Sequence, residues 1–194
     1  MSNLSPPRYD RVAIALHWVV AILIAAVGAV GLMFDNVLHP AKAFWLNLHA
    51  IFGLVLFGFI LARTTWRLTH PAPALPPGTS MITALSAKVL HRLMYLLMLA
   101  IPLIGLISFL WHARVFDFGL FRLDPSIAAN RAISRPTQTL HAWLTYALIA
   151  ALALHVLAAL WHHFVLRDGL LARMMPRALK GHSPDRGSAD AASA

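Results

Sequence analysis

Cysteine and glutamate are both absent from this chain of 194 residues, and only 12% of its residues are charged. Without cysteine, the chain cannot form disulfides, cysteine-ligated iron–sulfur clusters or thiolate metal sites. Its 16 lysines and arginines outnumber its 7 acidic residues, which gives a formal net charge of +9. A basic balance of this kind is typical of nucleic-acid binders. A hydrophobic content of 59% and a mean hydropathy of +0.69 argue instead against a water-soluble domain, and so against a nucleic-acid partner.

The remaining charges leave four long stretches free of Asp, Glu, Lys and Arg. Each reaches the roughly 20 residues that a helix needs to cross a hydrocarbon core ~30 Å thick. The sequence therefore predicts an all-α fold, an integral membrane four-helix bundle. The helices are expected at about 12–34, 44–66, 84–111 and 137–166, within a transmembrane domain of residues 1–180. Residues 181–194 are small and polar, which favours a disordered tail.

The first apolar stretch follows Arg8 and Arg11, as the hydrophobic part of a signal peptide would. It is longer than the ~7 to 15 residues of such a region, and it contains His17, which would weaken a signal. We therefore expect a retained helix.

The distribution of basic residues predicts the orientation of the four helices. Four crossings place both termini and the middle connector on one side, which carries eleven of the 16 lysines and arginines. The positive-inside rule then puts both termini in the cytoplasm. The opposite, periplasmic side carries the other five: Lys42, Arg114, Arg122, Arg131 and Arg135.

Five of the 11 histidines fall within the predicted spans, where a polar side chain is costly and indicates a function. His141 and His155 are 14 residues apart, so they share roughly one helix face and lie ~21 Å apart along the axis. The predicted orientation places His17 at the depth of His155, near the cytoplasmic side. It places His49 at the depth of His141. The sequence thus predicts an inner pair, His17 with His155, and an outer pair, His49 with His141.

Two facing imidazoles suit the axial positions of a haem iron, whereas zinc or copper sites need three or four converging ligands. Small residues such as Gly28, Gly31, Gly53 and Gly58 leave room for a macrocycle between helices. A single intramembrane histidine can also serve only to hydrogen-bond a neighbouring helix. That alternative weakens for two pairs matched in depth.

The fifth intramembrane histidine, His91, has no second histidine on its own helix. We expect a structural, quinone-proton or propionate-bonding role for it rather than iron ligation. Asn47, Thr139 and Thr145 are candidates for hydrogen bonds to the outer imidazoles. Arg63 is expected to extend to the inner headgroups.

The segments around the four paired histidines resemble the bacterial cytochrome b561 family of the inner membrane. The resemblance covers about Tyr9 to Pro176, and its strongest segments read YDRVAIALHW, LNLHAIFGLVLFGFILARTTWRL, TLHAW and ALHVLAALWHHFVLRDGLLARMMP. It implies a multi-pass protein of the bacterial inner membrane with two non-covalent haem b groups. The implied iron ligands are His17 and His155 for the inner haem, and His49 and His141 for the outer one. Some members look like superoxide oxidases that reduce ubiquinone, and cytochrome subunits of hydrogenases and formate dehydrogenases share the same histidine plan.

Three functions stay open at this point. The first is a diheme carrier between a periplasmic reductant such as superoxide and the ubiquinone pool. The second is a cytochrome b anchor of a larger membrane dehydrogenase, which implies a partner subunit, and a homodimer is a further possibility. The third is a haem-free transporter or structural protein. The arginines of the outer loop, set against Asp117 and Asp124, suit either steering of an anion or binding of phospholipid headgroups.

The charge count makes a prediction about topology. A reporter fused after Ala194 should signal from the cytoplasm, and one inserted near Ala128 from the periplasm, as measured by paired phosphatase and fluorescent fusions. The opposite pattern would show that the charge bias is misleading, and it would exchange the two haem sides.

Overall fold

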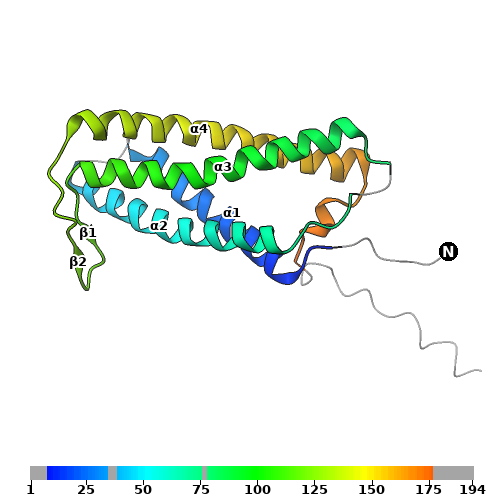
Figure 1. The fold of residues 1–194 in the computed structure, drawn as a ribbon, viewed down its shortest axis with the longest axis horizontal. Coiled ribbons are helices and arrows are strands. Elements are labelled where there is room, and N and C mark those ends of the chain that lie inside the picture. Colours follow the sequence, from blue (N-terminus) through cyan, green and yellow to red (C-terminus); the bar gives the residue numbers. More distant parts are fainter. Residues whose placement is uncertain (1–7, 35–38, 76–77, 177–194) are drawn as a thin grey trace, which may run out of the picture.

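Four long helices lie side by side and form the body of the molecule (Figure 1). The computed structural model describes residues 8–34, 39–75 and 78–176. The helices are α1 (Arg11–Leu32), α2 (His39–Thr69), α3 (Met81–Trp111) and α4 (Arg131–Trp161). All four are long and apolar enough to cross a membrane. This confirms the predicted all-α, four-helix membrane fold. The predicted polar tail lies outside the described residues.

Short elements occupy the two ends of the bundle. A two-stranded antiparallel hairpin of β1 (Phe116–Asp117) and β2 (Arg122–Leu123) joins α3 to α4. At the other end, α4 widens into a π-helical turn (His162–Leu166), which a 3-10 turn follows (Leu171–Arg173). We call the hairpin end the outer end and the opposite one the inner end, following the predicted topology.

All four helices begin before the limits that the absence of charge suggested, whereas α1 ends at Leu32 rather than near 34 and α4 at Trp161 rather than near 166. Helix α4 begins at Arg131 rather than near 137, because the side chain of Asn130 accepts a hydrogen bond from the Ala132 amide at 3.0 Å and caps the helix. Pro136 is tolerated close to this start, where it removes a single helical hydrogen bond. Helix α2 likewise begins at His39 rather than near 44. Basic residues therefore sit on helical ends that project past the apolar zone.

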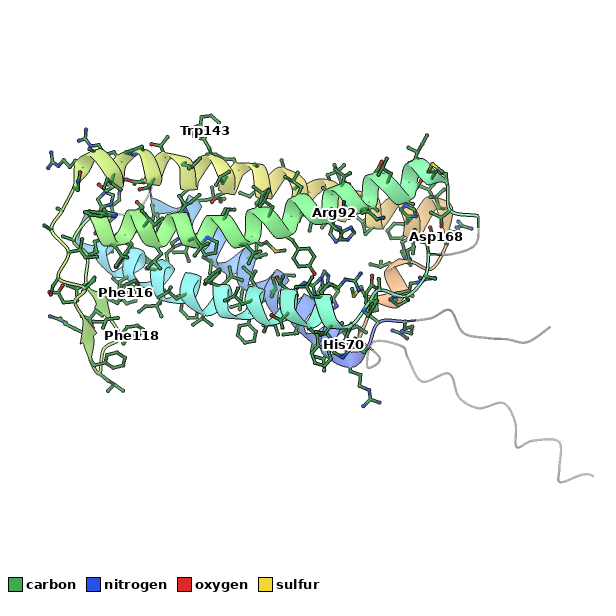
Figure 2. The ribbon with its side chains drawn as sticks, in the orientation of Figure 1. His70, Arg92, Phe116, Phe118, Trp143 and Asp168 are labelled. Atoms are coloured by element: carbon green, nitrogen blue, oxygen red, sulfur yellow. The ribbon has the colours of Figure 1, made fainter. Side chains whose placement is uncertain are left out.

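The buried core lies between the outer and inner ends and draws on all four helices. Its members include Val20 of α1, Ile60 of α2, Leu97 of α3 and Leu148 of α4, and Ile60 is only 1% exposed. Large side chains on the outside of the bundle are exposed instead. Trp143, for example, projects away from α4 and is 68% exposed (Figure 2). Large apolar side chains on the outer surface suit a bundle surrounded by lipid.

Hydrogen bonds from α2 fix the hairpin at the outer end. The Asn47 side chain donates to the Asp117 carbonyl at 2.6 Å and accepts from the Asp117 amide at 3.0 Å. Arg122 pairs with the Asp117 carboxylate at 2.9 Å. Phe116 stacks on Phe109 of α3 with ring centroids 4.2 Å apart. The hairpin is therefore tied to both α2 and α3.

Candidate functional site

Helices α2 and α4 bring the two outer histidines opposite each other. The ring centroids of His49 and His141 are 6.1 Å apart, and the ring planes are inclined at 82°. Both side chains are partly buried between helices. The predicted outer pair is thus brought together in the fold.

A backbone carbonyl orients each outer imidazole. His49 Nδ1 lies 3.1 Å from the carbonyl oxygen of Val27 on α1, and His141 Nδ1 lies 2.9 Å from that of Ile101 on α3. A carbonyl oxygen only accepts, so Nδ1 carries the proton in both rings. Each Nε2 is left with a lone pair, which is the state that a metal ligand requires.

Glycines allow these two imidazoles to approach the neighbouring helices. A Cβ added at Gly105 of α3 would lie 2.8 Å from His141 Nδ1 and Cε1, and one at Gly31 of α1 would lie 3.0 Å from His49 Cε1. Each glycine stands four residues after the carbonyl that orients the ring. The outer pair therefore rests on two similar supports, one from α1 and one from α3.

Helices α1 and α4 form the inner pair, with the His17 and His155 ring centroids 6.4 Å apart and the planes inclined at 68°. Among the described residues, neither ring has a hydrogen-bond partner. His91 of α3 lies closer to His155, at 5.2 Å between ring centroids, and its Nδ1 donates to the Ala87 carbonyl of its own helix at 2.6 Å. Three imidazoles therefore meet at the inner level.

Arg63 accompanies the inner pair, contrary to our expectation that it would extend to the headgroups. Its guanidinium donates to the Ala13 carbonyl of α1 at 3.3 Å and lies 5.9 Å from the ring centroid of Tyr95 of α3. Ala13 stands about one helical turn before His17 on α1, so this hydrogen bond holds the guanidinium near the inner level. The side chain turns inward because a carbonyl and an aromatic ring offer it partners between the helices.

The separations within the two pairs fit a shared metal ion. A metal–imidazole nitrogen bond is about 2 Å long and the ring centroid lies about 1 Å behind that nitrogen, so axial imidazoles on one metal ion have centroids about 6 Å apart. The observed 6.1 and 6.4 Å agree with this value, whereas the 5.2 Å between His91 and His155 is too short. Side chains added at Gly28, Gly53 or Gly58 would meet no heavy atom within 4 Å. These glycines therefore leave open space along α1 and α2.

A groove of about 1200 Å³ opens beside the outer pair, between the start of α2 and the hairpin. Leu48 and Ile51, which flank His49 on α2, form part of its wall, and Arg114 and Arg122 contribute cationic groups. Burial lowers the pKa of the Arg114 guanidinium. The groove therefore connects the outer surface with the α2 segment that carries His49.

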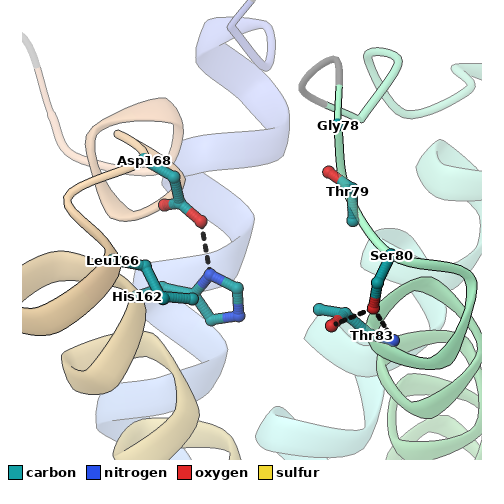
Figure 3. A pocket seen from close by; sticks show the side chains of 7 residues that line it. All are labelled: Gly78, Thr79, Ser80, Thr83, His162, Leu166 and Asp168. Atoms are coloured by element: carbon teal, nitrogen blue, oxygen red, sulfur yellow. Dashed lines mark hydrogen bonds and ion pairs between the residues drawn. The ribbon is translucent and has the colours of Figure 1, made fainter.

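A smaller cavity of about 220 Å³ lies at the inner end, between the start of α3 and the end of α4 (Figure 3). Asp168 accepts a hydrogen bond from His162 Nδ1, and the other ring nitrogen faces the side that Ser80 and Thr83 line. Burial acts to raise the pKa of Asp168, but hydrogen bonds from His162 and the Leu170 amide outweigh it and hold that pKa below its ordinary value.

The backbone around this cavity departs from regular helix. The π-helical turn at His162–Leu166 is followed by Arg167 with φ 51°, a left-handed conformation that is strained for a side chain other than glycine. This turn folds Asp168 back onto His162. Strain retained at a polar cavity is a common mark of a functional site.

Several supporting residues differ from those that the sequence suggested. Asn47 binds the hairpin backbone, and Thr145 donates to the His141 carbonyl at 2.8 Å, so neither contacts an outer imidazole ring. The carbonyls of Val27 and Ile101 take that role. A backbone carbonyl has no side chain that could mark it in the sequence. The glycine four residues after each carbonyl, Gly31 or Gly105, is a signal that could have found it.

Comparison with known proteins agrees with this geometry. A family model described as prokaryotic cytochrome b561 matches residues 8–177. "Cytochrome b561 homolog 2" of Escherichia coli K12 is 32% identical over 178 residues, which cover 88% of this chain and 93% of that protein. "Probable superoxide oxidase CybB" of Yersinia pestis is 28% identical over 172 residues, covering 88% and 97%. This chain therefore belongs to the prokaryotic cytochrome b561 family, as a multi-pass protein of the bacterial inner membrane that carries b-type haem for electron transfer.

Proposed function

We propose that this chain binds two b-type haems and passes electrons from a periplasmic reductant, superoxide, to ubiquinone. His49 and His141 are the proposed axial ligands of the outer haem, and His17 and His155 those of the inner haem. One observation carries the proposal: the chain holds two imidazole pairs at separations of 6.1 and 6.4 Å, each suited to one iron.

Two imidazoles held on each iron would favour electron transfer over oxygen binding, because they would leave oxygen no open position. Haem, when bound, supplies a one-electron redox couple at each level. The protein fixes the rings, and the core around Leu148, which is 7% exposed, fills the space between the levels. That apolar packing excludes water from the path between the two pairs.

The outer end suits an anionic donor. Exposed Lys42, Arg131 and Arg135 add positive charge there, whereas Arg122 is already paired with Asp117. The name of the Yersinia pestis relative, a superoxide oxidase, supports this choice of donor. Two superoxide ions give up one electron each and leave as two oxygen molecules, while one quinone takes both electrons and two protons to become a quinol.

The inner cavity suits the quinone ring. A cavity of about 150 Å³ holds a benzene ring, so about 220 Å³ accommodates a ring with oxygen and methyl substituents. His162 offers a ring nitrogen toward the cavity and is hydrogen-bonded through the other to Asp168. Leu166 lines the cavity and is exposed, and an isoprenoid tail would leave past its apolar side chain.

The haem assignment predicts two haem b groups per chain in the detergent-purified protein. Replacing His17 or His155 with Ala should remove the inner haem only, because the outer ligands remain, and replacing His49 or His141 with Ala should remove the outer haem only. A pyridine haemochrome assay measures the ratio, which should fall from two to one. His91→Ala is the control and should keep both haems, since its ring lies too close to His155 to share an iron with it. Loss of both haems in all four variants would argue against separate sites.

Superoxide as donor predicts a rate that depends on ionic strength. Raising salt from 0.01 to 0.1 M shortens the Debye length from ~30 to ~10 Å and should slow haem reduction by a superoxide pulse several-fold in stopped-flow absorbance. Arg131→Gln with Arg135→Gln should have a similar effect at low salt, without changing haem content. The matched control is Arg11→Gln with Lys88→Gln, which removes the same charge at the inner end.

Two outcomes would separate the parts of this idea. A pulse that reduces no haem in the intact protein would exclude superoxide and favour the anchor subunit of a larger dehydrogenase. A rate that ignores both salt and the arginines would contradict steering while leaving superoxide as the donor.

The quinone site predicts a specific defect on the inner side. His162→Gln should slow reoxidation of the reduced haems by decylubiquinone about tenfold or more, because the protonated imidazole paired with Asp168 would supply a proton to the quinone, and general acid catalysis is worth at least that much. The control is His163→Gln, which alters an exposed neighbouring imidazole that does not line the cavity. Equal reoxidation rates in both variants would place the quinone elsewhere.

A further inference from the structure

We propose that the groove at the outer end binds one zwitterionic phospholipid whose headgroup carries a primary ammonium, as in phosphatidylethanolamine. The groove lies between the start of α2 and the hairpin. Its volume of about 1200 Å³ exceeds the ~300 to 1000 Å³ of pockets for drug-sized ligands. None of the four proposed haem ligands and no residue of the inner cavity lines it. A ligand with a headgroup and two acyl chains suits a site of this size and place.

The wall of the groove on α2 faces lipid. Phe44, Leu48 and Ile51 belong to this wall and stand about 100° to 160° around the helix from His49, at ~100° per residue. His49 turns toward His141 of α4, so these three apolar side chains turn away from the bundle interior. The medium next to the groove is therefore the membrane.

The groove lies at the depth of a phospholipid headgroup and the first part of its chains. The Asn47 side chain holds Asp117 of the hairpin at its own level, and Ile51 lies ~6 Å farther inward along α2. Trp45 and Trp111 belong to the same region of α2 and α3, and tryptophan is enriched at membrane interfaces. The polar hairpin and the apolar wall below it thus follow the order of a lipid in the periplasmic leaflet.

The charges that line the groove have both signs. Arg122 is paired with Asp117. Arg114 has no hydrogen-bond or ion-pair partner within residues 8–34, 39–75 and 78–176. Asp124 uses one carboxylate oxygen to accept from the Ser126 amide at 2.8 Å. The groove thus offers a guanidinium for a phosphate and a carboxylate for an ammonium. An anionic headgroup would place a second negative charge near Asp124.

The hairpin is also suited to contact lipid. It projects past α2, across the long axis of the bundle (Figure 1). Its tip is apolar, because Leu120 is 99% exposed and Phe121 is 60% exposed. Phe121 stacks on Phe118, which lines the groove, with ring centroids 4.7 Å apart. Aromatic and aliphatic side chains of this kind are favourable at the boundary between headgroups and acyl chains. The lipid surface that covers the tip therefore also reaches the groove.

The first test measures lipid selectivity by native mass spectrometry of the delipidated, detergent-purified protein. One phosphatidylethanolamine per chain should bind about tenfold more tightly than phosphatidylglycerol, which lacks the ammonium. The same margin is expected over phosphatidylcholine, whose quaternary ammonium has no N–H to donate. Equal affinities for the three lipids, or a preference for phosphatidylglycerol, would overturn the proposal. Displacement of the lipid by decylubiquinone would also overturn it and assign the groove to a quinone.

The second test changes the two charges. Arg114→Gln should weaken phosphatidylethanolamine binding about tenfold, and Arg114→Lys should restore part of it, because the ammonium keeps the charge for the phosphate. Asp124→Asn should remove the preference over phosphatidylglycerol. Arg131→Gln is the matched control, since Arg131 is an exposed cation of the outer end that does not line the groove. Equal binding by Arg114→Gln and Arg131→Gln would contradict the site.

The third test changes the apolar wall. Phe44→Ala should weaken binding several-fold, because it removes apolar surface that the acyl chains would cover. Phe52→Ala is the control, since it removes the same side chain from an exposed position of α2 outside the groove. An equal loss in both variants would indicate general lipid contact and overturn a specific site. Circular dichroism and the haem spectrum check the fold of each variant. None of these substitutions alters a proposed haem ligand, so a wrong haem content would instead count against the proposed function.

Discussion

A polar ring inside the bundle is costly unless its nitrogens have partners, and this requirement shapes the structure around the outer pair. The outer rings meet it on one side with the Val27 and Ile101 carbonyls, and this leaves Nε2 available for a metal. A ring can reach a backbone carbonyl of a packed helix only where no side chain blocks it. Gly31 and Gly105 leave that space, each one helical turn after the carbonyl. Helices α1 and α3 thus support the proposed ligands that α2 and α4 carry.

One face of helix α4 and its continuation carries a residue of each site along the bundle. His141, Leu148, His155 and His162 follow one another at intervals of seven residues, so they lie along one face with only ~20° of drift per step. Those positions belong in turn to the outer pair, the buried core, the inner pair and the inner cavity. One helix face therefore sets the order in which the proposed electron path meets its sites. The strained turn that ends this face at Arg167 places Asp168 beside the last of them.

The main features of the site follow from the sequence because they depend on depth and periodicity. Charge-free runs of sufficient length give the helices, and counting residues from their ends pairs His17 with His155 and His49 with His141. What depends on side-chain direction does not follow. Arg63 turns inward to Ala13 and Tyr95 because of partners on other helices. The start of α4 at Arg131 depends on the helix cap at Asn130, and helix limits set by the absence of charged residues do not detect such a cap.

An inward electron path works against the membrane voltage. The cytoplasm of a respiring bacterium is negative, so moving an electron inward costs about 2.3 kcal/mol per 100 mV crossed. The two histidine pairs are ~21 Å apart by helix rise in a core ~30 Å thick, so transfer between the two proposed haems would cross roughly two thirds of that voltage. A donor at the outer end must therefore supply this free energy before an electron can reach the quinone site that we propose at the inner cavity.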